Sequence, residues 1–237
     1  YTEGERSEEL IALYQGRVGA VRDVAEQVRL LMSAAQASEK AVSDAGQSDQ
    51  SRAIALYGEV LNREAEHADA LMRLGPLLFA AEDWDAAIAV FHRTLAVTKE
   101  PVARRTALDA LGLIYHEHRQ DLVKCVQSLQ AALQYDPTDV ESLTRLAKVY
   151  QEAQDWTSSV NVLLRLAEVV TDPRAKIQTL LELTEIYEVR LKDDNSAILG
   201  ARKVLELDPG NQPAILRLVR LHERGENWQA LADVAAR

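Results

Sequence analysis

Four short stretches decide how this chain folds: TKEP at 98–101, QYDP at 134–137, VTDP at 170–173 and ELDP at 206–209. In each stretch an acidic residue precedes a proline, and these prolines recur every 36 residues in a chain that has only 6 prolines. Proline lacks a backbone N–H and moves the preceding residue out of the α region, so each pair ends one helix and lets the next begin. We therefore interpret the chain as an array of helical repeats, with a joint at each acid–proline pair.

A second pattern lies between the prolines. A leucine is followed, four places on, by an aromatic residue or histidine, at Leu111 and Tyr115, Leu146 and Tyr150, Leu183 and Tyr187, and Leu218 and His222. Each repeat then has a small residue and, four places later, an apolar one, at Ala87 and Phe91, Cys125 and Leu129, Ser159 and Leu163, and Ala197 and Ala201. This spacing resembles the tetratricopeptide repeat, a helix–turn–helix unit of about 34 residues. The resemblance implies an all-α fold, a right-handed α-α superhelix of stacked helical hairpins.

Alignment on these positions predicts one solenoid over 1–237. Its parts are a half repeat at 7–19, full repeats at 28–67, 68–104, 105–139, 140–176 and 177–211, and a truncated repeat at 212–237. Tryptophans recur only in every second repeat, at Trp84, Trp156 and Trp228, 72 residues apart. The structural unit is therefore predicted to be a pair of repeats. The tryptophans are expected in the core or at a joint, and the alternative is that they are exposed anchors for a partner.

Expected helices include 69–81, 84–97, 106–118, 140–153, 175–191, 212–224 and 228–236. Pro76 follows Gly75 inside the first of these, where a missing N–H should kink or split the helix. The polar stretch 43–50 is longer than its counterpart near Asp193, and we interpret it as a surface insertion. Because the chain starts at Tyr1 and stops inside an expected helix, we expect it to be a segment of a longer array.

Composition argues against several classes of protein. The net charge of −10 and the pI near 5.1 count against a nucleic-acid binder, which needs clustered lysine and arginine. No apolar run approaches the ~20 residues that span a bilayer, so we expect no membrane insertion. One cysteine cannot form an internal disulfide, which favours the cytoplasm, with the periplasm left open because the chain looks like a segment.

No residue pattern predicts catalysis, a metal or a cofactor. The best metal candidate is His116-Glu117-His118, but residues two apart on a helix point about 200° away from each other and cannot share one ion. Cys125 occupies the small-residue position between two helices, and no base is indicated beside it. We expect a packing role for Cys125 and no enzymatic activity.

In solenoids of this kind the first helices line a concave face, and the alignment implies which side chains point into it. The sixth and ninth places are Arg145 and Lys148, then Glu182 and Glu185, then Arg217 and Arg220. The proposed groove is extended by Asp109, His116, Gln151, Glu152 and Glu188. The signs alternate between repeats, which indicates either mutual neutralisation of adjacent helices or a charge-patterned peptide groove.

Three functions fit these observations. The first is a non-enzymatic scaffold that binds a protein or peptide segment in the groove, with Arg145, Lys148, Arg217 and Arg220 as its main contacts. The second is a spacer that self-associates through its uncapped ends. The third is the regulatory arm of an enzyme whose catalytic domain lies outside this chain.

Overall fold

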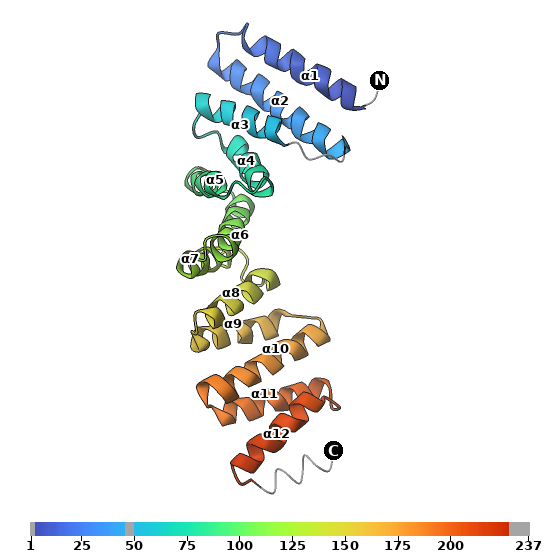
Figure 1. Cartoon of the computed structure of the whole chain (residues 1–237), viewed down its shortest axis with the longest axis vertical. Coiled ribbons are helices and arrows are strands. Elements are labelled where there is room, and N and C mark those ends of the chain that lie inside the picture. Colours follow the sequence, from blue (N-terminus) through green and yellow to red (C-terminus); the bar gives the residue numbers. More distant parts are fainter. Residues whose placement is uncertain (1–2, 46–49, 228–237) are drawn as a thin grey trace. The chain divides into compact units, whose positions relative to one another are not determined.

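The structure is a computed structural model that describes residues 3–45 and 50–227. Every regular element in this part of the chain is helical (Figure 1). The first compact unit, Tyr1–Asp121, contains α1 (Glu3–Val18), α2 (Val24–Ala45), α3 (Ser51–Arg63), α4 (Ala68–Ala80), α5 (Trp84–Val97) and α6 (Pro101–Glu117). The second, Leu122–Arg237, contains α7 (Leu122–Ala132), α8 (Val140–Glu152), α9 (Trp156–Val169), α10 (Pro173–Glu185), the π-helix η1 (Ile186–Leu191), α11 (Asp194–Leu207) and α12 (Gln212–Arg224).

Within each unit consecutive helices pack against one another, so each unit is a stack of helical hairpins. The even-numbered helices from α2 to α12 are the first helices of the repeats, and α3, α5, α7, α9 and α11 are the second helices. The all-α repeat fold expected from the sequence is thereby confirmed. The expected helix 228–236 lies outside the described residues, as does the part of the polar insertion at 46–49.

The positions picked out by the repeat pattern form the core. The leucines Leu111, Leu146, Leu183 and Leu218 are at most 2% exposed. The four small residues of the pattern are fully buried: Ala87, Cys125, Ser159 and Ala197. Small side chains allow the two helices of a hairpin to approach closely, which explains why a cysteine is accepted at position 125.

The acid–proline pairs form two kinds of joint that alternate along the chain. Pro101 and Pro173 occupy the first turn of α6 and α10, where a missing N–H costs nothing. Pro137 and Pro209 instead lie in the loops before α8 and α12. The predicted boundaries at 105 and 177 therefore fall inside α6 and α10, because a proline starts each of those helices several residues earlier.

The first helices consequently alternate in length. α4, α8 and α12 have 13 residues each, whereas α6 has 17 and α10 continues directly into η1. Arginines follow the same alternation: Arg93 donates to the carbonyl of Ala65, and Arg165, 72 residues later, donates to the carbonyl of Pro137 at 3.2 Å. Each of these arginines ties a second helix to the joint before its own repeat.

Pro76 does not split its helix, since α4 continues through it to Ala80. Gly75, immediately before it, lies against the ring of Phe91, and a Cβ there would be 2.6 Å from Phe91 Cε1. The sequence Gly75-Pro76 is therefore a close-packing point of α4 against α5 within a continuous helix.

A left-handed residue ends the first helix of five repeats. These residues have positive φ although none is glycine: Glu82, Gln120, Gln154, Lys192 and Glu226. At Gln154 (φ 59°) the next N–H, of Asp155, returns to the carbonyl of Tyr150 at 2.8 Å. Asp155 then caps α9 by accepting from the N–H of Ser158 at 3.1 Å, and hydrogen bonds from the side chain and the backbone N–H of Ser158 hold the pKa of Asp155 below its usual value.

Glycine at position 154 is expected to stabilise the chain. A side chain in the left-handed region is strained, and Gln154→Gly relieves that strain, so the free energy of unfolding should rise by about 0.5 kcal/mol after the greater flexibility of the unfolded chain is subtracted. Urea titration followed by far-UV circular dichroism measures the change. Gln154→Ala is the matched control, because alanine keeps the strain; equal stability of the two variants would contradict the explanation.

Candidate binding surface on the first helices

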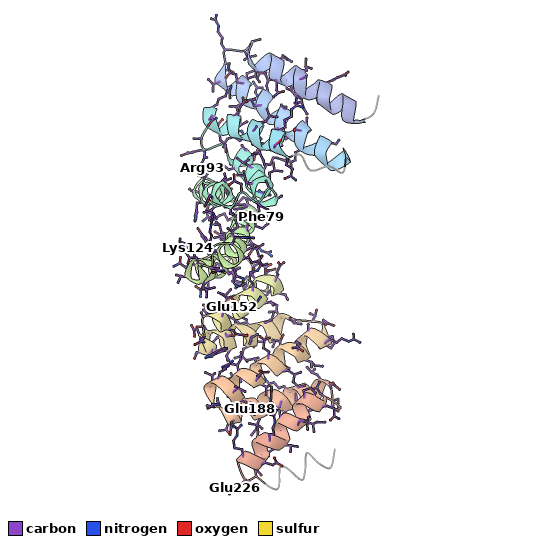
Figure 2. The ribbon with its side chains drawn as sticks, in the orientation of Figure 1. Phe79, Arg93, Lys124, Glu152, Glu188 and Glu226 are labelled. Atoms are coloured by element: carbon purple, nitrogen blue, oxygen red, sulfur yellow. The ribbon has the colours of Figure 1, made fainter. Side chains whose placement is uncertain are left out.

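Nine of the eleven side chains predicted to line the groove lie on α8, α10, η1 and α12 of the second unit. We call the surface that these nine side chains form the first-helix face. Two neighbouring first helices are joined there by Gln151 of α8, whose Nε2 donates to Glu182 Oε1 of α10 at 2.6 Å. Glu152 on α8 and Glu188 on η1 are labelled in Figure 2. The predicted groove residues of α8 and α10 are therefore carried by first helices whose side chains contact each other.

Arg217 is the centre of a buried ionic cluster between α12 and the preceding repeat. Its Nε lies 2.9 Å from Glu188 Oε2 and its Nη2 lies 3.6 Å from Glu185 Oε2, while Nη1 donates to the carbonyl of Leu181 at 3.1 Å. The side chains of Arg217 and Glu188 are only 14% and 11% exposed. Mutual neutralisation across adjacent helices thus accounts for the opposite charges of Arg217 and Glu188.

Arg224 completes this cluster from the end of α12. Its Nη2 lies 3.6 Å from Glu188 Oε1 and 2.9 Å from Asp194 Oδ1, so Glu188 is shared by two arginines. Sequence reasoning did not include Arg224, because it lies beyond the places that the repeat pattern assigns to the groove. The one indication in the sequence is that Arg224 lies in the last turn of an expected helix, where a cation interacts favourably with the helix dipole.

The remaining charges of the first-helix face are more accessible. Arg145 is 19% exposed and pairs with Glu141 on its own helix at 3.0 Å. The 69% exposed Lys148 lies 3.9 Å from Glu152. Arg220 is exposed and forms no ion pair with any residue in 3–45 or 50–227. Lys148 with its neighbour Glu152, Arg220 and the 66% exposed Glu185 are therefore the predicted charges that a partner could reach.

The other two predicted residues belong to the first unit. Asp109 pairs with Arg105 on α6 at 3.5 Å, and His116, near the end of that helix, is half-buried. His118 stacks on the ring of Trp84, with centroids 3.8 Å apart and planes 12° apart. His118, one of the two histidines of the best metal candidate, thus packs on a neighbouring repeat. In the described part of the chain no three potential metal ligands lie close enough together to hold an ion.

The two tryptophans that the structure describes begin α5 and α9, and each contacts a residue of the next repeat. Trp84 contacts the edge of Phe79 at 5.4 Å in addition to His118, and the guanidinium of Arg190 lies 4.6 Å over the ring of Trp156. Stacking and cation–π contacts of this kind hold adjacent repeats together. Trp228, the third in the series, lies outside the described residues.

His222 replaces the tyrosine of the repeat pattern, and it is 4% exposed. Burial, reinforced by the nearby charge of Arg202, holds the pKa of His222 below its ordinary value. Its Nε2 has no hydrogen-bond partner in the described part of the chain. The buried imidazole of His222 is therefore a packing residue of α12.

Cavities open between helices in both units, and the sequence pattern indicated none of those described here. One of about 360 Å³ lies between α7, α8 and α9. One of about 160 Å³ lies between α9, α10 with η1, and α11, and one of about 230 Å³ lies between α4, α5 and α6. The pattern could not reveal them because it marks residues that fill the core, whereas cavities depend on how far adjacent repeats are offset.

The fold and these surfaces define an all-α helical-hairpin repeat protein whose described residues present charged faces and small cavities. No helix among them is long and apolar enough to cross a bilayer. No model of a known protein family matches the sequence, and no curated protein is significantly similar to it.

Solved structures with the same architecture are nevertheless found. YrrB, described as a TPR protein with an unusual peptide-binding site, is 15% identical, with 85% of this chain and 95% of that chain covered at a TM-score of 0.56. The MamA protein is 17% identical, with 78% and 93% covered and a TM-score of 0.59. PilF of Pseudomonas aeruginosa is 14% identical, with 94% and 100% covered and a TM-score of 0.52. The chain has the tetratricopeptide-repeat fold, as its repeat pattern predicted.

Proposed function

We propose that this chain is a non-enzymatic interaction scaffold that binds a segment of a partner protein on the first-helix face of its second unit. The observation that carries the proposal is the row of contacts between successive first helices, Gln151 with Glu182 and Arg217 with Glu185 and Glu188. These contacts fix the spacing of the exposed charges on α8, α10 and α12 before any partner arrives. A surface fixed in advance loses less free energy on binding than one that must be ordered.

The charges that remain accessible suggest the kind of segment. Lys148 and Arg220 present positive charge on α8 and α12, and Glu185 presents negative charge on α10 between them. A segment with acidic residues flanking a basic one would match this order. A protein or peptide partner fits these spaced single charges better than nucleic acid does, since nucleic acid requires clustered cations. The lone cysteine is compatible with a reducing compartment, and a cytoplasmic location is part of the proposal.

Charge reversal tests the proposal with a probe that needs no known partner. Twelve-residue peptides selected from a random phage-displayed library on the wild-type chain are synthesised, labelled and measured by fluorescence anisotropy. In the Lys148→Glu/Arg220→Glu variant two charge contacts with the peptide are lost, each worth up to about 1 kcal/mol. Binding of these peptides should therefore weaken by about tenfold or more. The melting temperature should change by a few degrees at most, because both residues are exposed.

The matched control carries the same change in net charge elsewhere. Lys99→Glu/Arg174→Glu alters two exposed cations outside the proposed surface and should leave peptide affinity within about twofold of wild type. Equal loss in both variants would show a general charge effect. Unchanged affinity in the Lys148→Glu/Arg220→Glu variant would remove the first-helix face from the proposal.

A further inference from the structure

Two of the cavities occupy equivalent places on either side of α9. The pattern leucine and tyrosine of one repeat, Leu146 and Tyr150, line the larger cavity, and their counterparts in the next repeat, Leu183 and Tyr187, line the smaller one. α9 contributes to both cavities, with Asn161 and Arg165 on one side and Leu164 on the other. The cavities are thus a repeated feature of the second-helix side of the second unit, distinct from the first-helix face.

The lining of each of these two cavities carries a basic side chain and no carboxylate, in an otherwise acidic chain. The sequence has 37 aspartate and glutamate residues and a net charge of −10, yet neither lining contains a carboxylate. Each lining contains one basic residue, Arg165 in the larger cavity and Lys203 in the smaller. Both are exposed, and neither forms an ion pair with a described residue. Lys203, and the guanidinium hydrogens of Arg165 that do not donate to the carbonyl of Pro137, are therefore available to acidic groups of a partner.

The two cavities differ in what else they offer. The larger one presents the exposed amides of Gln130, Gln134 and Asn161, which can both donate to and accept from a peptide main chain. Gln130 also donates to the hydroxyl of Tyr150 at 2.7 Å, which holds one amide in place. The smaller cavity is walled by Leu164 and Leu199, which are 40% and 60% exposed. One cavity suits a polar main chain and the other an apolar side chain.

We infer that the second-helix side of the second unit binds an acidic peptide segment of a partner protein. An apolar side chain of this segment enters between Leu164 and Leu199, its main chain meets the amides of the larger cavity, and its carboxylates pair with Arg165 and Lys203. A nucleic acid also carries negative charge, but one cation for each cavity is too few for a phosphate backbone. This site is independent of the first-helix face, so either can fail without the other.

Synthetic ligands test the inference directly on the full chain. The probe is a labelled ten-residue peptide with one leucine among aspartate, glutamate and glycine, measured by fluorescence anisotropy. We expect it to bind at least about tenfold more tightly than a peptide with lysine in place of the acids, or one with serine in place of leucine. No detectable binding of the acidic peptide, or equally tight binding of a single-stranded oligonucleotide of twenty nucleotides, would overturn the inference.

Two substitutions with matched controls locate the site. Asn161→Asp adds a carboxylate to the larger cavity without changing side-chain size. Leu199→Glu adds a carboxylate to the smaller cavity, in place of one of its two exposed leucines. Each should weaken the acidic peptide about tenfold, whereas Asn195→Asp and Leu207→Glu, which make the same changes at exposed positions of α11 outside both linings, should stay within about twofold. All four positions are exposed, and circular dichroism checks that the fold is kept.

The first-helix variant distinguishes the two sites. Lys148→Glu/Arg220→Glu should leave binding of the acidic leucine peptide within about twofold, because neither residue lines a cavity beside α9. If that variant abolishes binding while Asn161→Asp and Leu199→Glu do not, the peptide binds the first-helix face, and the second-helix site is refuted.

Discussion

Replacing Arg217 with methionine is expected to lower the free energy of unfolding of the second unit by about 3 kcal/mol. Arg217 and Glu188 are both largely buried, and their closest atoms are 2.9 Å apart. Methionine keeps most of the volume of the arginine side chain but removes its charge. Glu188 is then left buried with only the more distant Arg224, at 3.6 Å, to offset its charge. Urea unfolding followed by far-UV circular dichroism gives the measurement.

Two further variants separate the ion pair from a general effect of removing arginine. Arg220→Met changes an exposed arginine three residues away on the same helix and should cost less than about 0.5 kcal/mol. Arg217→Met/Glu188→Leu removes both charges and should recover most of the stability, since a buried pair replaced by apolar side chains is often nearly neutral. If the double variant is as unstable as Arg217→Met, the loss comes from packing and the ionic explanation is wrong.

The second large effect is expected for Leu111→Ala on α6. Leu111 is 1% exposed, and truncating a buried leucine loses its transfer free energy and leaves a cavity, which together cost about 3 kcal/mol. In a repeat protein each hairpin contacts only its neighbours, so the missing contacts cannot be replaced from a distant part of a central core. The same urea titration measures the loss in the first unit.

Val102→Ala is the matched control for Leu111→Ala, because Val102 lies on the same helix and is 70% exposed. Its stability should stay within about 0.5 kcal/mol of wild type. Similar losses for the two substitutions would mean that α6 is not anchored through the leucine of the repeat pattern. That result would weaken the use of the pattern to define the core.

Much of the fold could be predicted because the place of a residue within the repeat determines whether its side chain is buried. The helices 84–97 and 212–224 were predicted with both ends correct, and the leucine and small-residue positions are buried as expected. The start of α6 was missed, because a proline ends a preceding helix and starts the next one equally well. The π-helix η1 was also missed, since the apolar stripe from Pro173 onward gives no sign of where the winding changes.

The candidate site was predictable only at the level of which helix carries each charge. Arg217 and Arg220 have the same side chain at neighbouring places of the pattern, yet one is 14% exposed and paired while the other is exposed. Their difference arises from η1, which places Glu188 beside Arg217. The cavities beside α9 depend on the offset between successive second helices, which no single-repeat pattern encodes.

The alternation of long and short first helices has a consequence for anyone who would lengthen or shorten this chain. Copying one repeat would set two long first helices, or two short ones, next to each other. It would also place an arginine equivalent to Arg93 or Arg165 beside a loop of the other type, which lacks the equivalent of the carbonyls of Ala65 and Pro137 that these arginines bind. Copying 72 residues keeps both alternations in phase. The smallest interchangeable building block of this protein is therefore a four-helix module, and gain or loss of such blocks would be the least disruptive route by which arrays of this design change size.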